Sequence, residues 1–193
     1  MTATKLNRLK NTAYHEAGHA VIARVLTLAS GEATIKPNYR KRTAGHSITA
    51  DPYACVREWG NRGKVRDLDA AVWHARIITY MAGAETEAVL LGMDAIGGGD
   101  DRLQIGKMAE ELACGHDKFW NRTEVRLRAM TRMLIRRHRD RIERVAKALL
   151  KKTTLTGRQL DKLVGRSVDD VKVNAPFLLT MHRQRAALKR RRS

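Results

Sequence analysis

The chain is poor in aromatic residues, cysteines and long apolar runs, and each scarcity excludes a class of protein. Aromatic residues make up 5% of its 193 residues, which leaves few rings on which single-stranded bases could stack. Cys55 and Cys114 are too few for a disulfide framework and indicate a reducing compartment. No run reaches the roughly 18 apolar residues of a membrane span, and no apolar signal-peptide core follows Met1. We therefore expect a cytoplasmic protein without a membrane span.

Nucleotide-binding loops are missing as well. The pairs Gly63-Lys64 and Gly106-Lys107 lack the upstream glycine and the downstream hydroxyl residue of a phosphate loop. The glycine triplet at residues 97–99 follows a helical pattern rather than a strand, so a dinucleotide-binding turn is not expected there. The chain has no visible means of hydrolysing ATP.

Acidic residues are outnumbered by basic ones. Lys and Arg total 38 against 20 Asp and Glu, which gives a formal net charge of +18. This imbalance suggests an anionic partner, such as nucleic acid, an anionic membrane surface or an acidic protein segment. Arginines are dense over residues 122–144, and residues 184–193 form a basic tail. Such a helix and tail could bind phosphates without reading sequence, although a solvated basic face is the commoner meaning of such runs.

Apolar periodicity predicts a mainly α fold. Helices are expected over about residues 5–29, 68–91, 100–115, 123–151 and 156–164. Two strand-like segments at residues 33–36 and 45–49 flank a basic connection suited to a hairpin, and residues 53–65 are predicted to be a loop. Gly92 is the expected C-terminal cap of the second helix. The length suits one domain over residues 1–183, followed by the basic tail.

The most informative segment is residues 15–19, which read His-Glu-Ala-Gly-His. On a helix, His15 and His19 are offset by only about 40° around the axis, so both imidazoles can reach one metal ion. Glu16 lies near that ion but turned aside, where it can take a proton from an activated water. Apolar flanks indicate a buried helix, in which imidazoles need a partner. The pattern predicts a zinc hydrolase with Glu16 as the catalytic base, although an accidental His pair would bind nothing.

A catalytic zinc ion needs a third protein ligand and an open position for water. The sixth residue after His19 is Val25, so the extended motif that places a third His there is ruled out. The third ligand must therefore come from a separate element. Asp100 and Asp101, which follow the glycine triplet at an expected helix start, are the best-placed carboxylates, and the pattern leaves the choice between them open.

These residues, taken with later ones, resemble the peptidase domain of the FtsH-type membrane-anchored AAA zinc proteases. The family's His-Glu-x-Gly-His helix matches residues 15–19. Its Gly-Gly-Arg-x-Ala-Glu-Glu-x-x-x-Gly helix is echoed by Ala-Gly-Ala-Glu-Thr-Glu-Ala-Val-Leu-Leu-Gly at residues 82–92. Its Gly-Ala-x-Asn-Asp turn is echoed at residues 98–101, and its C-terminal helical pattern at residues 137–157. The similar segments occur in the same order as in the family and cover about residues 10–165.

The resemblance implies a helical zinc-metallopeptidase fold with a small β-hairpin next to the active-site helix. It assigns the third ligand to Asp101, so the implied site is His15, His19 and Asp101 with Zn²⁺ as the cofactor. Family members assemble as hexamers, and an oligomer is therefore an expectation too. Glu87 is a candidate to orient a ligand His, although an ion pair or a surface charge would explain it equally well. His46 is a candidate to stabilise the oxyanion, or a solvated loop residue.

Two departures from the family bear on the expected activity. The AAA ATPase module and the membrane anchors that precede the peptidase domain in the family are not found in this sequence, and Ala84 and Ala88 replace a family Arg and a family Glu. The expected function is therefore hydrolysis of peptide bonds in unfolded or flexible proteins without ATP. The rival expectation is a catalytically retired fold that binds nucleic acid or acts as a scaffold through its basic helix and tail.

Overall fold

The computed structural model describes residues 3–28, 30–38, 43–49, 66–94, 99–113 and 117–165, and most of these residues are helical. The helices are α1 (Ala3–Val25), α3 (Arg66–Leu91), α4 (Gly99–Ala113), α5 (Asp117–Arg137), α6 (Arg139–Lys152) and α7 (Gly157–Val164). Three short strands accompany them: β1 (Ser30–Thr34), β2 (His46–Thr49) and β3 (Thr154–Leu155). The prediction of a mainly α fold is confirmed.

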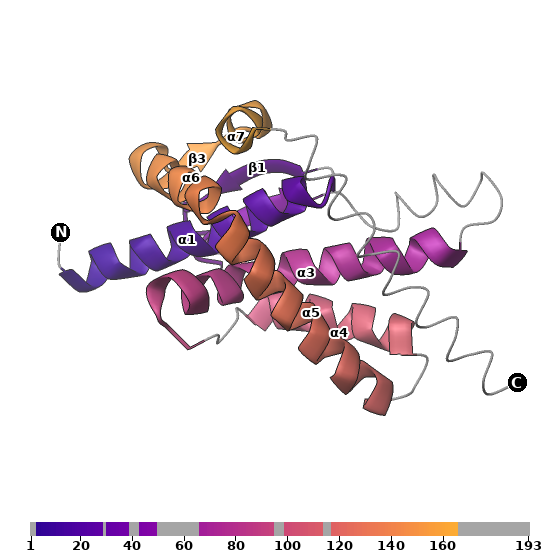
Figure 1. The fold of residues 1–193 in the computed structure, drawn as a ribbon. Helices are drawn as coiled ribbons and strands as arrows, with labels where there is room; N and C mark the ends of the chain where they lie inside the picture. The colour runs from indigo at the N-terminus through magenta and orange to yellow at the C-terminus, as the bar shows by residue number, and fades with distance from the viewer. Residues whose placement is uncertain are drawn as a thin grey trace, which may run out of the picture.

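Helices α1 and α3 pack along each other at the centre of the molecule, and the other elements are arranged around this pair. Helix α5 crosses α3, α6 lies on α1, and α4 packs against α3 and α5 (Figure 1). Small side chains on α1 allow the close approach of its neighbours, since Ala13, Ala17 and Ala20 are fully buried. One apolar core runs through these contacts and the inner face of the sheet. The central pair thus places the His-Glu-Ala-Gly-His segment deep in the fold.

The strands form an antiparallel sheet in the order β2-β1-β3, which packs beside α1. Thr34 pairs with His46 and Ala33 with Ser47, so the predicted hairpin is present beside the motif helix. A register shift between Ser30 and Ala33 marks a bulge in β1. Strand β3 was not predicted, because two residues are too few to show an alternating pattern. Among the strands that the structure describes, β2 lies at one edge of the sheet.

Helix α1 ends at Val25, earlier than the prediction of about residue 29. Its end has the hydrogen bonds of a Schellman motif, in which the Leu28 N–H donates to the Ala23 carbonyl and the Thr27 N–H to the Arg24 carbonyl. Thr27 takes the positive φ of 60° that such an end requires. A β-branched residue rarely adopts this conformation, so Thr27 gave no signal of a helix end, and the prediction placed the end near the next glycine, Gly31.

The prediction of one helix over residues 123–151 is wrong. The segment divides at His138, whose backbone lies at φ −107° and ψ 21° between α5 and α6. Each half buries its apolar side against a different helix, α5 against α3 and α6 against α1. The amide of His138 still donates to the Leu134 carbonyl, so the helical hydrogen bonding is largely kept across the bend.

Helices α3, α4 and α7 agree closely with the ranges predicted from the sequence. Helix α3 is followed by Gly92 at φ +68°, as expected for a C-terminal cap, and Thr156 caps α7 through a reciprocal pair of hydrogen bonds with Gln159. The predicted loop at residues 53–65 and the basic tail at residues 184–193 lie outside the described residues. Over the described part of the chain, no helix combines the length and the apolar character that a membrane crossing requires.

Candidate metal site

Helices α1 and α4 bring His15, His19 and Asp101 together. The Nε2 atom of His15 lies 3.1 Å from Asp101 Oδ2, and the Nε2 atom of His19 lies 3.2 Å from the same oxygen. One ligand atom from each residue falls within 4.8 Å of the others, which makes the three a possible metal-binding group. Asp100, the other candidate carboxylate, is exposed and is not a member of this group.

The opposite nitrogen of each imidazole is held by α3. His15 Nδ1 lies 2.8 Å from Glu87 Oε1, and His19 Nδ1 donates to the carbonyl oxygen of Thr79 at 2.7 Å. A carbonyl oxygen can only accept, so the Nδ1 atom of His19 carries a proton, and in the neutral ring Nε2 then presents a lone pair. Glu87 favours the same tautomer of His15. The Nε2 lone pairs of the two neutral imidazoles and a carboxylate oxygen of Asp101 therefore converge. These acceptor atoms repel one another unless a proton or a metal cation lies between them.

A glycine of α3 keeps the space beside these nitrogens clear. A β-carbon added at Gly83 would collide with the Nε2 atoms of both His15 and His19. Gly18 on α1 has a similar role at the helix crossing, since its β-carbon would lie 2.6 Å from the Ala82 carbonyl oxygen. The two glycines let α1 and α3 approach closely enough for α3 to orient both rings.

Glu16 lies beside the His-His-Asp group and is almost fully buried, at 5% exposure. Burial raises the pKa of its carboxyl group, while the neighbouring imidazoles of His19 and His15 act in the opposite direction. Gly45, the residue before β2, covers this carboxylate, because a β-carbon at Gly45 would lie 2.9 Å from Glu16 Oε1. The chain thus positions a shielded carboxylate with a raised pKa next to three potential ligands.

The potential ligands are tightly coupled electrostatically. Burial opposes protonation of His15, but its hydrogen bonds with Asp101 and Glu87 outweigh that effect and raise the pKa of the imidazole to about 10. The pKa of His19 is also raised, since attraction to Asp101 overcomes burial. The two imidazoles in turn hold the pKa of Asp101 well below its usual range despite its burial. The carboxylate therefore stays ionised, and a cation is strongly favoured at the imidazole nitrogens.

Two further residues were candidates from the sequence. Glu87 does contact a candidate ligand, through His15 Nδ1, as the hypothesis of an orienting role requires. His46 is about half exposed, and its Nε2 atom lies 3.7 Å from Glu32 Oε1 rather than in the group of ligand atoms. The Thr79 carbonyl was missed, because a main-chain acceptor gives no signal in the sequence. Gly83 was noted from the sequence only as part of the segment at residues 82–92 that resembles a family pattern.

Fold and site together define a class: a mainly helical domain in which a partly buried His-His-Asp group, with ligand atoms close enough to hold a metal ion, lies beside a buried carboxylate. The chain is 24% identical over 190 residues to the ATP-dependent zinc metalloprotease FtsH of Kosmotoga olearia. The match covers 81% of this chain and 29% of that protein. No protein-family model matches the chain. The similarity indicates an FtsH-like relationship, and it extends over less than a third of the relative.

Proposed function

We propose that this chain is a zinc-dependent endopeptidase that cuts unfolded or flexible proteins and needs no ATPase of its own. The observation that carries the proposal is the convergence of His15, His19 and Asp101 beside the buried carboxylate of Glu16. The similarity to a zinc metalloprotease supports the same chemistry. Two imidazole nitrogens and one carboxylate oxygen are a donor set that suits Zn²⁺ and leaves a coordination position for water.

In the proposed reaction, His15 and His19 would hold zinc through Nε2, and Asp101 would hold it through its carboxylate. A bound zinc ion would supply Lewis acidity, which lowers the pKa of water and polarises a carbonyl group. Glu16 would accept the proton of the attacking water and deliver it to the leaving amine. In the metal-free chain, burial raises the pKa of Glu16, which favours its acceptance of a proton. The edge strand β2 would hold the substrate extended through backbone hydrogen bonds.

The purified chain should contain about one zinc ion per molecule and hydrolyse casein without ATP. Glu16→Gln should lower the rate by at least a hundredfold while zinc content is unchanged, because the base is lost and the ligands remain. Glu110→Gln, at an exposed position of α4, is the matched control and should keep full activity. Zinc-free protein whose proteolysis is unaffected by Glu16→Gln would contradict the proposal.

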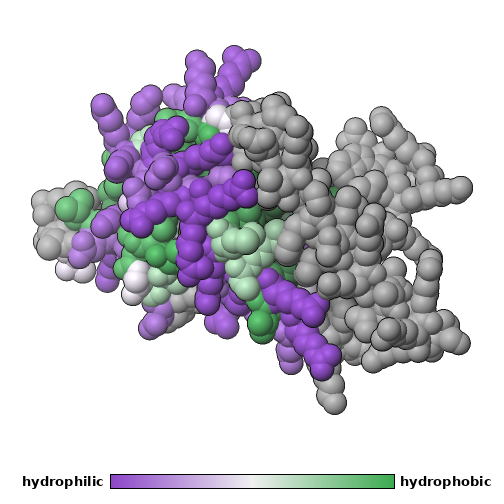
Figure 2. Space-filling view, in the orientation of Figure 1, coloured by the Kyte–Doolittle hydropathy of each residue, from purple (hydrophilic) through white to green (hydrophobic). Residues whose placement is uncertain are grey.

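A second candidate function is binding of duplex DNA through the outer face of α5, with or without peptidase activity. Arg128 and Arg132 of this helix are engaged by Glu85, whereas Arg122, Arg136 and Arg137 are exposed. Figure 2 shows hydrophilic side chains over α5 and α6, interspersed with apolar ones. Arginine suits phosphate oxygens because its planar guanidinium can donate two parallel hydrogen bonds. The scarcity of aromatic residues favours the backbone of a duplex over stacked single strands.

Changing Arg122, Arg136 and Arg137 together to Gln should weaken DNA binding about equally for unrelated sequences. It should also reduce the slope of log affinity against log salt by about 3, since each lost phosphate contact removes roughly one unit. Fluorescence anisotropy with a labelled duplex at several salt concentrations measures both quantities. The control changes Arg102 and Lys107, two exposed cations of α4, to Gln and should alter the slope little. Equal losses in the two variants would argue against a defined DNA-binding face.

A further inference from the structure

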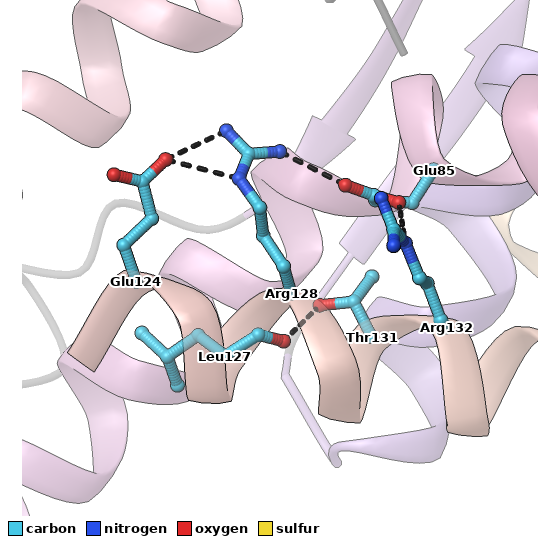
Figure 3. Close-up of polar contacts among 6 residues, drawn as sticks. All are labelled: Glu85, Glu124, Leu127, Arg128, Thr131 and Arg132. Carbon is cyan, nitrogen blue, oxygen red and sulfur yellow. Dashed lines mark hydrogen bonds and ion pairs between the residues drawn. The ribbon is translucent and has the colours of Figure 1, made fainter. Parts of the chain in front are cut away.

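Glu85 is a fully buried carboxylate of α3 that lies outside the candidate metal site, and both of its oxygens are bound by α5. The Nη1 atom of Arg128 donates to Oε1 at 2.9 Å, and the Nε atom of Arg132 donates to Oε2. The Glu85 side chain has 0% exposure, whereas the arginines reach it from the surface at 31% and 47% exposure (Figure 3). These ion pairs join two helices that are far apart in the sequence.

Arg128 divides its guanidinium between two carboxylates. Its Nε and Nη2 atoms donate to Glu124 Oε1 at 3.0 and 2.8 Å, while Nη1 serves Glu85 (Figure 3). Burial lowers the pKa of Arg128, but the hydrogen bonds with Glu124 and Glu85 outweigh this and leave the pKa raised. A buried carboxylate is tolerated only when its partners are well placed, so this geometry restrains the position of α3 on α5.

The face of α3 opposite to Glu85 carries the groups that orient the candidate ligands. Thr79, Gly83 and Glu87 are spaced four residues apart and share one side of the helix, and Glu85 is about 200° around the axis from Gly83. Glu87 and the Thr79 carbonyl contact His15 and His19, and Gly83 abuts both rings. A rotation or slide of α3 relative to α5 would therefore move all three groups with respect to α1.

We propose that Glu85, Arg128 and Arg132 form a positioning cluster that fixes α3 so that Glu87 and the Thr79 carbonyl hold the imidazoles of His15 and His19 in the metal-binding orientation. This inference rests on the proposed function, because it assumes that the two imidazoles bind a metal ion. It assigns to Arg128 and Arg132 a role distinct from that of the exposed arginines of α5. Orienting partners of metal-bound histidines affect metal affinity strongly. The cluster would act on these partners by fixing the position of α3.

Metal affinity and metal geometry are the informative measurements, made well below the unfolding temperature of each variant. Glu85→Gln should weaken zinc binding about tenfold in competition with a chelator and should change the visible absorption bands of the Co²⁺-substituted protein. Glu124→Gln is the matched control, because it removes a partner of Arg128 within α5 and leaves the link to α3 intact. This control should change neither the affinity nor the spectrum.

A purely structural role is tested by replacing Glu85, Arg128 and Arg132 together with Leu. Well-packed apolar replacements of buried ion pairs often restore stability, so the unfolding temperature should recover while zinc affinity stays about tenfold weak. Recovery of affinity along with stability would overturn the positioning role. Should Glu85→Gln fail to fold, Arg132→Gln takes its place; it keeps Arg128 on Glu85 and should weaken zinc binding severalfold.

The outcomes separate the two proposals. Unmodified protein that binds no zinc defeats the proposed function, and the positioning role falls with it. Unmodified protein that binds zinc and cleaves casein, together with a folded Glu85→Gln variant of equal affinity and equal Co²⁺ spectrum, defeats the positioning role alone.

Discussion

The candidate site depends on the protonation pattern of two imidazoles, and that pattern is set by atoms that face away from the metal position. His19 Nδ1 donates to a carbonyl oxygen, and His15 Nδ1 contacts the Glu87 carboxylate. Both contacts favour the tautomer that exposes the Nε2 lone pair toward Asp101. The three acceptor atoms are consequently prepared for a cation by α3, which contributes none of them.

Gly83→Ala tests how closely α3 must approach the imidazoles. The added methyl group would collide with Nε2 of His15 and His19, so zinc affinity should fall at least a hundredfold. Gly106→Ala is the matched control, because Gly106 is an exposed glycine of α4 whose β-carbon position meets no atom within 4 Å among the described residues outside its own helix backbone. It should leave zinc binding intact and stabilise the fold by about 0.5–1 kcal/mol. Chelator competition and thermal unfolding give the two readouts, and unchanged zinc affinity in Gly83→Ala would contradict the site geometry.

At the residue scale, the sequence could indicate only what side-chain spacing encodes. The four-residue spacing places His15 and His19 on one side of a helix, and the adjacent position places Glu16 beside them. Asp101 is distinguished from Asp100 only by resemblance to a family, because helix-start geometry suits both carboxylates. Thr79 acts through its main-chain carbonyl and could have been any residue, so no reading of side chains could have found it.

At the scale of elements, periodicity located the helices well and their ends less well. Helices α3, α4 and α7 lie close to their predicted ranges because apolar spacing, Gly92 and the Thr156 cap are local signals. The break at His138 and the pairing of β3 depend on which distant helix or strand each segment contacts. Such tertiary contacts are not encoded in a short window of sequence, and both features were missed for that reason.

At the scale of the whole molecule, the candidate metal site ties together helices from distant parts of the chain. His15 and His19 come from α1, near the start of the sequence, and Asp101 comes from α4, about half-way along it. A metal ion bound by all three would therefore stabilise the folded state over the unfolded chain. At a free zinc concentration 1,000 times the dissociation constant, this stabilisation is about 4 kcal/mol. Removal of the metal should lower the unfolding temperature of the entire domain.

The loss of folding stability on metal removal should increase as the pH rises. In the metal-free chain a proton on His15 replaces the metal charge, and the pKa of this imidazole is raised from 6.5 to about 10 on folding. A raised pKa contributes stability that is fully present below about pH 6.5 and is lost as pH rises toward 10. Metal-bound ligands carry no such proton. The gap between the unfolding temperatures in buffered zinc and in chelator should consequently widen from pH 6.5 to 8.5.

Asp101→Asn provides the control for this pH dependence, because Asp101 is both a candidate ligand and the main group that favours protonation of His15. In this variant the unfolding temperature in chelator should vary less with pH, and zinc should raise it little at any pH. A gap in the unmodified protein that stays constant or narrows between pH 6.5 and 8.5 would show that the His15 proton and the metal do not compete for the same place. Differential scanning fluorimetry at matched ionic strength resolves the two cases, since salt would otherwise screen the exposed charges of this basic chain unequally.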